Sequence, residues 1–272
     1  MNFGLESDLK EDKIEKLRLK GYELFSDNDY QKAIDFFEEV LKLDSKDVAV
    51  LIDLGISYQL IGNHKKAIEC FDQIIKIDPN EKKAYYNKAW SYLQLKNFGL
   101  AIEFFKKAIE IDPKYLKALS NLSVAYLMHG EYEKSIETCE SVLVHDKNHK
   151  LAWNNMALAY QHIQDYVKAI ECLRKAINIE SEDRFALFNL GINYQQIDDF
   201  TNAIISYKKA LTLDPNFIEA WGNMGGAYEQ LNDYENAINC FEKILEIDPK
   251  NKVAKNVLSK FKSKYDKSDE NG

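Results

Sequence analysis

The chain has 272 residues, of which 46% are hydrophobic and 29% are charged, and its formal net charge is −8. This composition excludes an intrinsically disordered chain, and no apolar run approaches the roughly 18 to 20 residues of a membrane-spanning helix. The negative charge disfavours general nucleic-acid binding, because such proteins need basic surface to neutralise phosphates. Eleven glycines and four prolines are too few for a sandwich or barrel with many tight turns, so we expect a mostly helical chain.

The predicted elements begin with an N-terminal tail at residues 1–13, which is acidic and has no apolar segment typical of a secretory signal. A cytoplasmic protein is therefore the default expectation. From residue 14 the sequence repeats every 34 residues without insertion or deletion, and the four prolines occupy one position of this period. The seven predicted repeats are 14–47, 48–81, 82–115, 116–149, 150–183, 184–217 and 218–251.

Each repeat predicts two amphipathic helices. Position 21 of the repeat is always isoleucine, and positions 8 and 20 hold only glycine, alanine or serine. At 100° per residue, positions 4, 7, 8 and 11 share one face of a first helix, and positions 17, 20, 21, 24, 27 and 28 share one face of a second. Small residues at positions 8 and 20 let the two helices approach closely. A proline such as Pro79 or Pro113 ends the second helix and starts the next repeat.

The spacing of large and small residues within a repeat is highly specific. It reads Trp153, Met156, Ala157, Tyr160, Ala169, Leu173 and Ala176 in the fifth repeat, and Trp221, Met224, Gly225, Tyr228, Ala237, Phe241 and Pro249 in the seventh. This pattern resembles the tetratricopeptide repeat. The resemblance implies an all-α protein, an α-solenoid that winds as a right-handed superhelix of seven helix-turn-helix units.

The end of the chain predicts a capping helix at residues 252–264. Val253, Val257, Leu258 and Phe261 share one face of this segment, which would cover the apolar end of the last repeat. Residues 265–272 are expected to be a disordered tail. Within the array, the fourth repeat departs most from the pattern and is the expected weak point, since its proline and terminal isoleucine are replaced by Lys147 and His145.

Candidate catalytic and metal-binding residues form no convincing set. The four cysteines lie on second helices of different repeats, beyond disulfide reach, and no CxxC motif occurs. His145 and His149 have i, i+4 spacing, but a turn between two repeats separates them and no third zinc ligand is evident. Gly222, Gly225 and Gly226 follow no strand, as a phosphate-binding loop would require. We therefore expect no enzyme, no metal and no cofactor.

The first helix has a second face, opposite the packed one, that is expected to line the concave groove of the solenoid. Only seven of its 42 residues are charged. Position 6 is asparagine in five consecutive repeats, at Asn87, Asn121, Asn155, Asn189 and Asn223. Asparagine is a mediocre helix former, but its amide offers two donors and an acceptor to a peptide backbone. The row resembles asparagine ladders in other repeat scaffolds, which hold the main chain of an extended polypeptide. The alternative is local hydrogen bonding between neighbouring helices.

Positions 5 and 9 add an apolar stripe beside these asparagines. Its members expected to contact a ligand are Ile52, Ile56, Tyr86, Trp90, Val124, Leu158, Phe188 and Ile192, although part of the stripe must pack between first helices. Glutamines such as Gln59, Gln161 and Gln195 are expected to extend the neutral, amide-rich surface. The carboxylate clamp that some members of the family use for chaperone tails needs lysine at position 5 with asparagine at position 9, a pair that does not occur.

The sequence therefore predicts a protein-interaction adaptor or scaffold that holds a neutral or mildly apolar, extended polypeptide. No nucleic acid and no membrane insertion are expected. The open alternative is a self-assembling scaffold, in which solenoids stack end to end once the capping helix moves aside.

Overall fold

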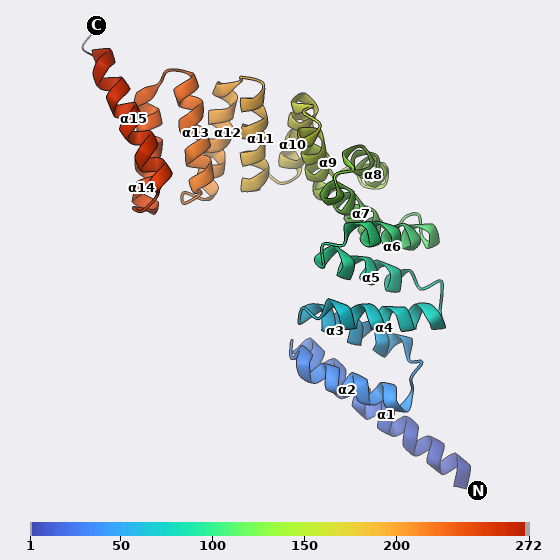
Figure 1. The fold of residues 1–272 in the computed structure, drawn as a ribbon. Helices are drawn as coiled ribbons and strands as arrows, with labels where there is room; N and C mark the ends of the chain where they lie inside the picture. Colours follow the sequence, from blue (N-terminus) through green and yellow to red (C-terminus); the bar gives the residue numbers. More distant parts are fainter. Residues whose placement is uncertain (1, 270–272) are drawn as a thin grey trace. The chain divides into compact units, whose positions relative to one another are not determined.

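The computed structural model describes the backbone of residues 2–269 and the side chains of residues 9–260. Helices alone make up its regular structure, and no strand occurs within residues 2–269. Figure 1 shows the helices following one another along the chain. Their bounds are α1 (Asn2–Ser26), α2 (Tyr30–Leu43), α3 (Val48–Leu60), α4 (His64–Ile77), α5 (Lys82–Gln94), α6 (Phe98–Ile111), α7 (Leu116–His129), α8 (Tyr132–His145), α9 (Lys150–His162), α10 (Tyr166–Ile179), α11 (Arg184–Gln196), α12 (Phe200–Leu213), α13 (Ile218–Gln230), α14 (Tyr234–Ile247) and α15 (Lys252–Asp269).

The helices keep the 34-residue period, and the all-α helix-turn-helix architecture is confirmed. The first helices of repeats 2 to 7 begin at the first residue of each predicted repeat, at Val48, Lys82, Leu116, Lys150, Arg184 and Ile218. Six of the seven second helices start behind an Asp or Asn whose side chain accepts a backbone N–H, as Asp29 does from Lys32 and Asn63 from Lys66. The capping residue lies at the same position of each of these repeats, so the sequence sets the starts of these second helices locally.

The turn between the two helices of a repeat needs one residue in the left-handed region. That residue is at position 15 in every repeat: Asn28, Gly62, Lys96, Gly130, Gln164, Asp198 and Asn232 all have positive φ values between 58° and 85°. Only two of the seven are glycine, the residue that adopts this conformation without steric cost. Packing of the two helices therefore holds the turn in place even where the local residue disfavours it.

The small residues at position 8 are required by close packing, as expected. A Cβ atom added to Gly55 would lie 2.7 Å from the ring of Phe71, and one added to Gly191 would overlap the ring of Tyr207. Both rings come from position 24 of the second helix and are fully buried. The glycine thus removes the atom that would push the two helices of the repeat apart.

The chain divides into two compact units, Met1–Glu131 and Tyr132–Gly272. The boundary falls within the fourth repeat, the one that departs most from the sequence pattern. Within each unit, a first helix packs against the second helix of its own repeat and that of the preceding repeat wherever these belong to the same unit. Each unit therefore has a layer of first helices and a layer of second helices.

Helices extend into both segments expected to be tails, since α1 begins at Asn2 and α15 ends at Asp269. Helix α15 packs on α14, with Ala254 buried and Val257 and Leu258 half-buried against the core of the last repeats. Val253 is 71% exposed and does not belong to the covering face, because the i, i+3, i+4 set that reaches the core is Ala254, Val257 and Leu258. Phe261 lies outside the described side chains, and residues 270–272 of the expected tail lie outside the described chain.

Candidate functional site

The asparagine row, defined as Asn87, Asn121, Asn155, Asn189 and Asn223, lies on first helices in both units. Asn87 and Asn121 are on α5 and α7 of the first unit, and the other three are on α9, α11 and α13 of the second. All five side chains are half-buried. The row is therefore partly open to solvent.

The five amides differ in their hydrogen bonding. Asn121 donates its Nδ2 to the hydroxyl of Tyr86 at 2.9 Å, which joins α7 to α5. Asn155 also interacts within the chain. Asn87, Asn189 and Asn223 make no side-chain hydrogen bond with any residue whose side chain is described. Local bonding, the alternative considered from the sequence, thus holds for Asn121, whereas three amides keep their donors and acceptor available.

Position 6 of the second repeat holds Asp53 in place of asparagine. Burial raises the pKa of this carboxyl group, although a hydrogen bond from the Tyr22 hydroxyl and the positive charge of Lys83 act in the opposite direction. A charged carboxylate at this position is therefore energetically less favourable than the neutral amide found in the next five repeats.

The apolar stripe is half-buried along its whole length. This holds for Ile52, Ile56, Tyr86, Trp90, Val124, Leu158, Phe188 and Ile192. Part of the stripe packs internally: the ring of Tyr86 lies 5.3 Å from that of Tyr115, and the ring of Phe188 lies 4.8 Å from that of Phe217. Ile52, Trp90 and Ile192 also pack against buried clusters. These residues stabilise the repeats and leave only part of their surface for a ligand.

Two of the glutamines expected on this surface instead connect successive repeats. Gln59 is only 8% exposed and donates to the carbonyl of Asn87 and the hydroxyl of Ser91, both at 2.8 Å. Gln161 accepts a hydrogen bond from Asn193 Nδ2 at 3.1 Å. Position 12 lies at the edge of the face, and there Gln59 and Gln161 turn towards the neighbouring repeat instead of extending the ligand surface. Gln195, at the same position, accepts a hydrogen bond from the Tyr207 hydroxyl of its own repeat.

The cysteines and histidines have structural positions. All four cysteines are free and buried, and burial raises the pKa of Cys70, Cys172 and Cys240 to about 12, which suppresses the nucleophilic thiolate. His149 accepts the backbone N–H of Ala152 at the start of α9. Among the described residues, no group of three His, Cys, Asp or Glu side chains could hold a metal ion. Nor is any described helix long and apolar enough to cross a membrane.

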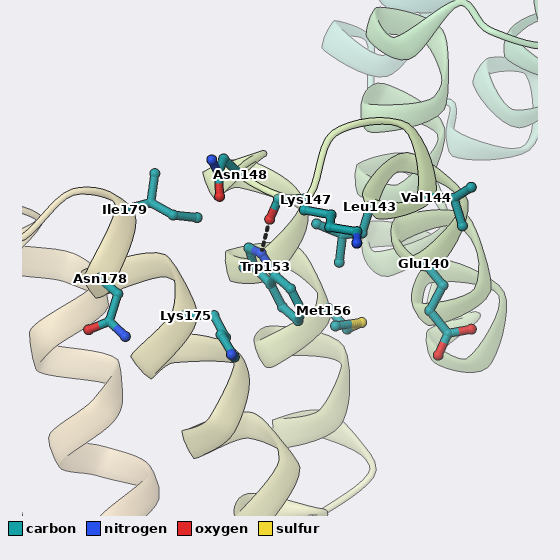
Figure 2. A pocket seen from close by; sticks show the side chains of 10 residues that line it. All are labelled: Glu140, Leu143, Val144, Lys147, Asn148, Trp153, Met156, Lys175, Asn178 and Ile179. Carbon is teal, nitrogen blue, oxygen red and sulfur yellow. Dashed lines mark hydrogen bonds between the residues drawn. The ribbon is translucent and has the colours of Figure 1, made fainter.

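A hollow of about 940 Å³ lies on the second-helix side of the second unit, among α8, α9 and α10. It is lined by Glu140, Leu143, Val144, Lys147, Asn148, Trp153, Met156, Lys175, Asn178 and Ile179, and we call it the outer groove. Figure 2 shows Trp153 at its centre, with Lys175 on one side and Glu140 and Val144 on the other. The indole of Trp153 donates to the carbonyl of Lys147 at 3.0 Å, which fixes the ring.

The outer groove was not predicted from the sequence, because a ligand was expected only on the first-helix face. The signal was present at position 29, on the second helix. Val144 stands there in the fourth repeat, whereas the other repeats have Lys42, Lys76, Glu110, Asn178, Thr212 and Glu246. An isolated apolar residue at a position that is otherwise polar marks a surface that the fold does not require.

Comparison with known proteins identifies the repeats. Family models described as tetratricopeptide repeat match residues 24–89, 83–115, 104–137, 151–216 and 218–251. The chain is similar to the C-terminal part of a TPR repeat-containing protein from Cytophaga hutchinsonii, with 17% identity and a TM-score of 0.74 over 88% of this chain and 98% of that one.

Two further solved structures resemble parts of the chain. MamA is 27% identical, with a TM-score of 0.59 over 62% of this chain and 92% of that one. YrrB, described as a TPR protein with an unusual peptide-binding site, is 19% identical, with a TM-score of 0.60 over 70% of this chain and 98% of that one. No curated protein matches the chain.

Proposed function

Because the chain belongs to the tetratricopeptide repeat family, we propose that it is a protein-interaction scaffold whose first-helix face binds an extended, neutral or mildly apolar polypeptide. Proteins with this fold generally serve as non-enzymatic scaffolds for protein partners. The proposed binding of a polypeptide rests on the side-chain amides of Asn87, Asn189 and Asn223. These amides make no hydrogen bond with a described side chain, and they are half-buried beside an apolar stripe.

A carboxamide suits the main chain of a ligand because it can donate to a carbonyl and accept from an N–H at once. Such bonds depend on backbone groups that every residue offers, so they give affinity without demanding a particular sequence. Selectivity then comes from the exposed parts of the apolar stripe and from the low charge of the face, which favours a neutral ligand.

The surroundings of Asn223 support approach by a main chain. Gly222 and Gly226 flank it on α13, and a Cβ atom added to either would meet no atom closer than 3.9 Å. Packing therefore does not require glycine at these positions, although each glycine costs roughly 1 kcal/mol of helix stability relative to alanine. The missing side chains leave the backbone of α13 accessible beside the amide.

We propose that the chain has no catalytic activity, as is general for proteins built from tetratricopeptide repeats. A cytoplasmic location fits the four unpaired cysteine thiols, which a reducing compartment would preserve. The peptide-binding site named for YrrB, a structural neighbour, lends general support to peptide recognition.

The test begins with a peptide selected on the full chain from a phage-displayed library of random 12-residue sequences. Replacing Asn189 and Asn223, both in the second unit, together by alanine removes two hydrogen-bonding groups, so the measured Kd of the selected peptide should rise roughly 30-fold at about 1 kcal/mol per bond. N-methylation of single peptide bonds in the ligand should weaken binding similarly, because it removes main-chain donors.

Asn178→Ala, on the second-helix side, is the matched control and should leave the Kd unchanged. Circular dichroism must give the same helix content for the Asn189→Ala/Asn223→Ala variant and the native chain. Equal affinities of these two proteins for the peptide would refute main-chain capture by the asparagine row. A selected peptide that carries a strong net charge would refute the expected ligand class.

A further inference from the structure

The outer groove has an apolar floor between two helical walls. Trp153 and Met156 rise from α9, and Leu143 adds to the floor from α8. Helices α8 and α10 form the walls, each 14 residues long, which corresponds to about 21 Å. A trough of this kind, bordered by two helices, has the shape that accepts the apolar side of a third helix.

One wall carries an apolar residue that the fold does not need. Val144 is 77% exposed at the rim, although the same position is polar in the other six repeats. The exposure of Val167 on α10 and Ile205 on α12, at 57% and 46%, continues this apolar character along the second helices of the same unit. The surface is therefore suited to contact with protein rather than with water.

Two lysines at the rim of the outer groove have no ion-pair partner among the described side chains. Lys147 and Lys175 form no ion pair with any described side chain, whereas Lys150 in the same unit pairs with Glu180 at 2.7 Å and Asp183 at 3.2 Å. Figure 2 shows Lys175 facing the hollow from one wall, and Glu140 lies on the other. In a chain with net charge −8, two unpaired lysines beside an apolar floor form a local site for carboxylates.

We propose that the outer groove binds an amphipathic α-helix of a partner protein. The helix places large apolar side chains over Trp153 and Met156, against Val144. Carboxylates meet Lys175 on the flank that faces α10 and Lys147 in the turn after α8, and the flank that faces Glu140 is neutral or basic. This surface is separate from the first-helix face, so the chain has two binding surfaces for two different kinds of segment.

Two synthetic 16-residue probes test the proposal on the full chain. Both are alanine-based helices labelled with fluorescein, with leucines at i, i+4, i+7 and i+11, and they differ only in having glutamate or lysine along one flank. Fluorescence polarisation should give the glutamate probe about tenfold higher affinity than the lysine probe. The glutamates can form two exposed ion pairs with Lys147 and Lys175, whereas lysines on the probe would be repelled by them.

Variants on the rim locate the binding site. The Lys147→Glu/Lys175→Glu double variant should reverse the preference between the two probes. Val144→Asn should weaken binding of the glutamate probe about fivefold, because apolar contact is lost. Ile205→Asn, a change at another exposed apolar residue that lies on α12 and does not line the groove, is the matched control and should leave the affinity unchanged.

Several results would overturn the proposal. Failure of both probes to bind at 0.5 mM, or equal affinity for both, would remove the stated partner chemistry. Equal weakening by Val144→Asn and Ile205→Asn would move binding away from the groove. Sedimentation of the native chain and the Val144→Asn variant provides the remaining test, since a dimer that the variant dissociates would assign the groove to a second copy.

Discussion

The outer surfaces of the second helices differ between the two units. In the first unit, positions 18, 22 and 29 of the second helices carry no apolar side chain: they are Gln31, Asp35, Lys42, Lys65, Glu69, Lys76, Gly99, Glu103 and Glu110. In the second unit, Val144, Val167 and Ile205 occupy such positions and are exposed. Both units have the same helix pairs, so packing within a repeat does not explain the difference.

Equivalent positions of a repeat allow fold and function to be separated. Where the two units agree, as in the glycines of position 8, the residue is held by contacts inside the repeat. Where they differ at an exposed position, stability places little constraint on the residue and binding can select it. This distinction predicts the order of the effects of three sets of substitutions on stability.

The largest effect is expected inside the repeat, at Gly191. Gly191→Ala pushes a Cβ atom against the fully buried ring of Tyr207, whose hydroxyl is tied to Gln195 Oε1 at 2.7 Å. The ring has little freedom to move, so overpacking should cost about 1 to 3 kcal/mol. Urea unfolding followed by circular dichroism measures this loss.

Gly55→Ala in the first unit is the comparison. The ring of Phe71 has no hydroxyl to hold it, and Ala89 already packs with a buried phenylalanine, Phe105, in the next repeat. We expect a smaller loss of stability than for Gly191→Ala. Part of this loss is offset, because alanine stabilises a helix by roughly 1 kcal/mol relative to glycine. A loss equal to that of Gly191→Ala would show that the tyrosine hydroxyl does not restrain the ring.

A smaller effect on stability is expected when either of two aspartates, Asp183 or Asp53, is replaced by asparagine. At pH 7 the effect should have opposite signs in the two units. Burial alone would raise the pKa of Asp183, but the N–H groups of Ala186 and Phe185 and the ammonium of Lys150 outweigh it and lower that pKa. Its stabilising contribution is therefore present above its unfolded pKa of about 3.9 and is lost as the pH falls through the folded pKa. Asp183→Asn should cost up to about 1 kcal/mol at pH 7 and less at pH 3.

Asp53 in the first unit should behave in the opposite way. Its pKa is raised in the folded state, so its favourable contribution is complete below the unfolded pKa and is lost as the pH rises through the folded value. Asp53→Asn should therefore stabilise the chain at pH 7, with a gain that disappears at pH 3. Thermal unfolding of both variants at the two pH values tests the pair, and equal signs at pH 7 would contradict the assigned electrostatics.

The smallest effect is expected at Val144. Val144→Lys gives the fourth repeat the lysine that the first two repeats have at the same position, Lys42 and Lys76. Because this site is 77% exposed, the free energy of unfolding should change by no more than about 0.5 kcal/mol. Urea unfolding provides the measurement. A loss above 1 kcal/mol would mean that Val144 serves the fold, and the difference between the two outer surfaces would then need a structural cause.

The sequence allowed the starts of the first helices in repeats 2 to 7 to be predicted, because the information is local. Position 21 is always isoleucine, and a capping Asp or Asn recurs before most second helices. The candidate site was less predictable. Asn87 and Asn121 occupy the same repeat position, yet only Asn121 has the Tyr86 hydroxyl within hydrogen-bond distance, a difference set by a residue 35 positions away.

By itself, the sequence determined the period, the pairing of helices and the family, since apolar periodicity and capping act over a few residues and repeat without interruption. The tertiary structure alone decided which amides stay free, which glutamines connect repeats and where the outer groove lies. Each of these depends on side chains about 30 residues apart that meet only when repeats stack, as Gln59 meets Ser91. Exposure and hydrogen-bond partnership are properties of that packing, and no single repeat contains them.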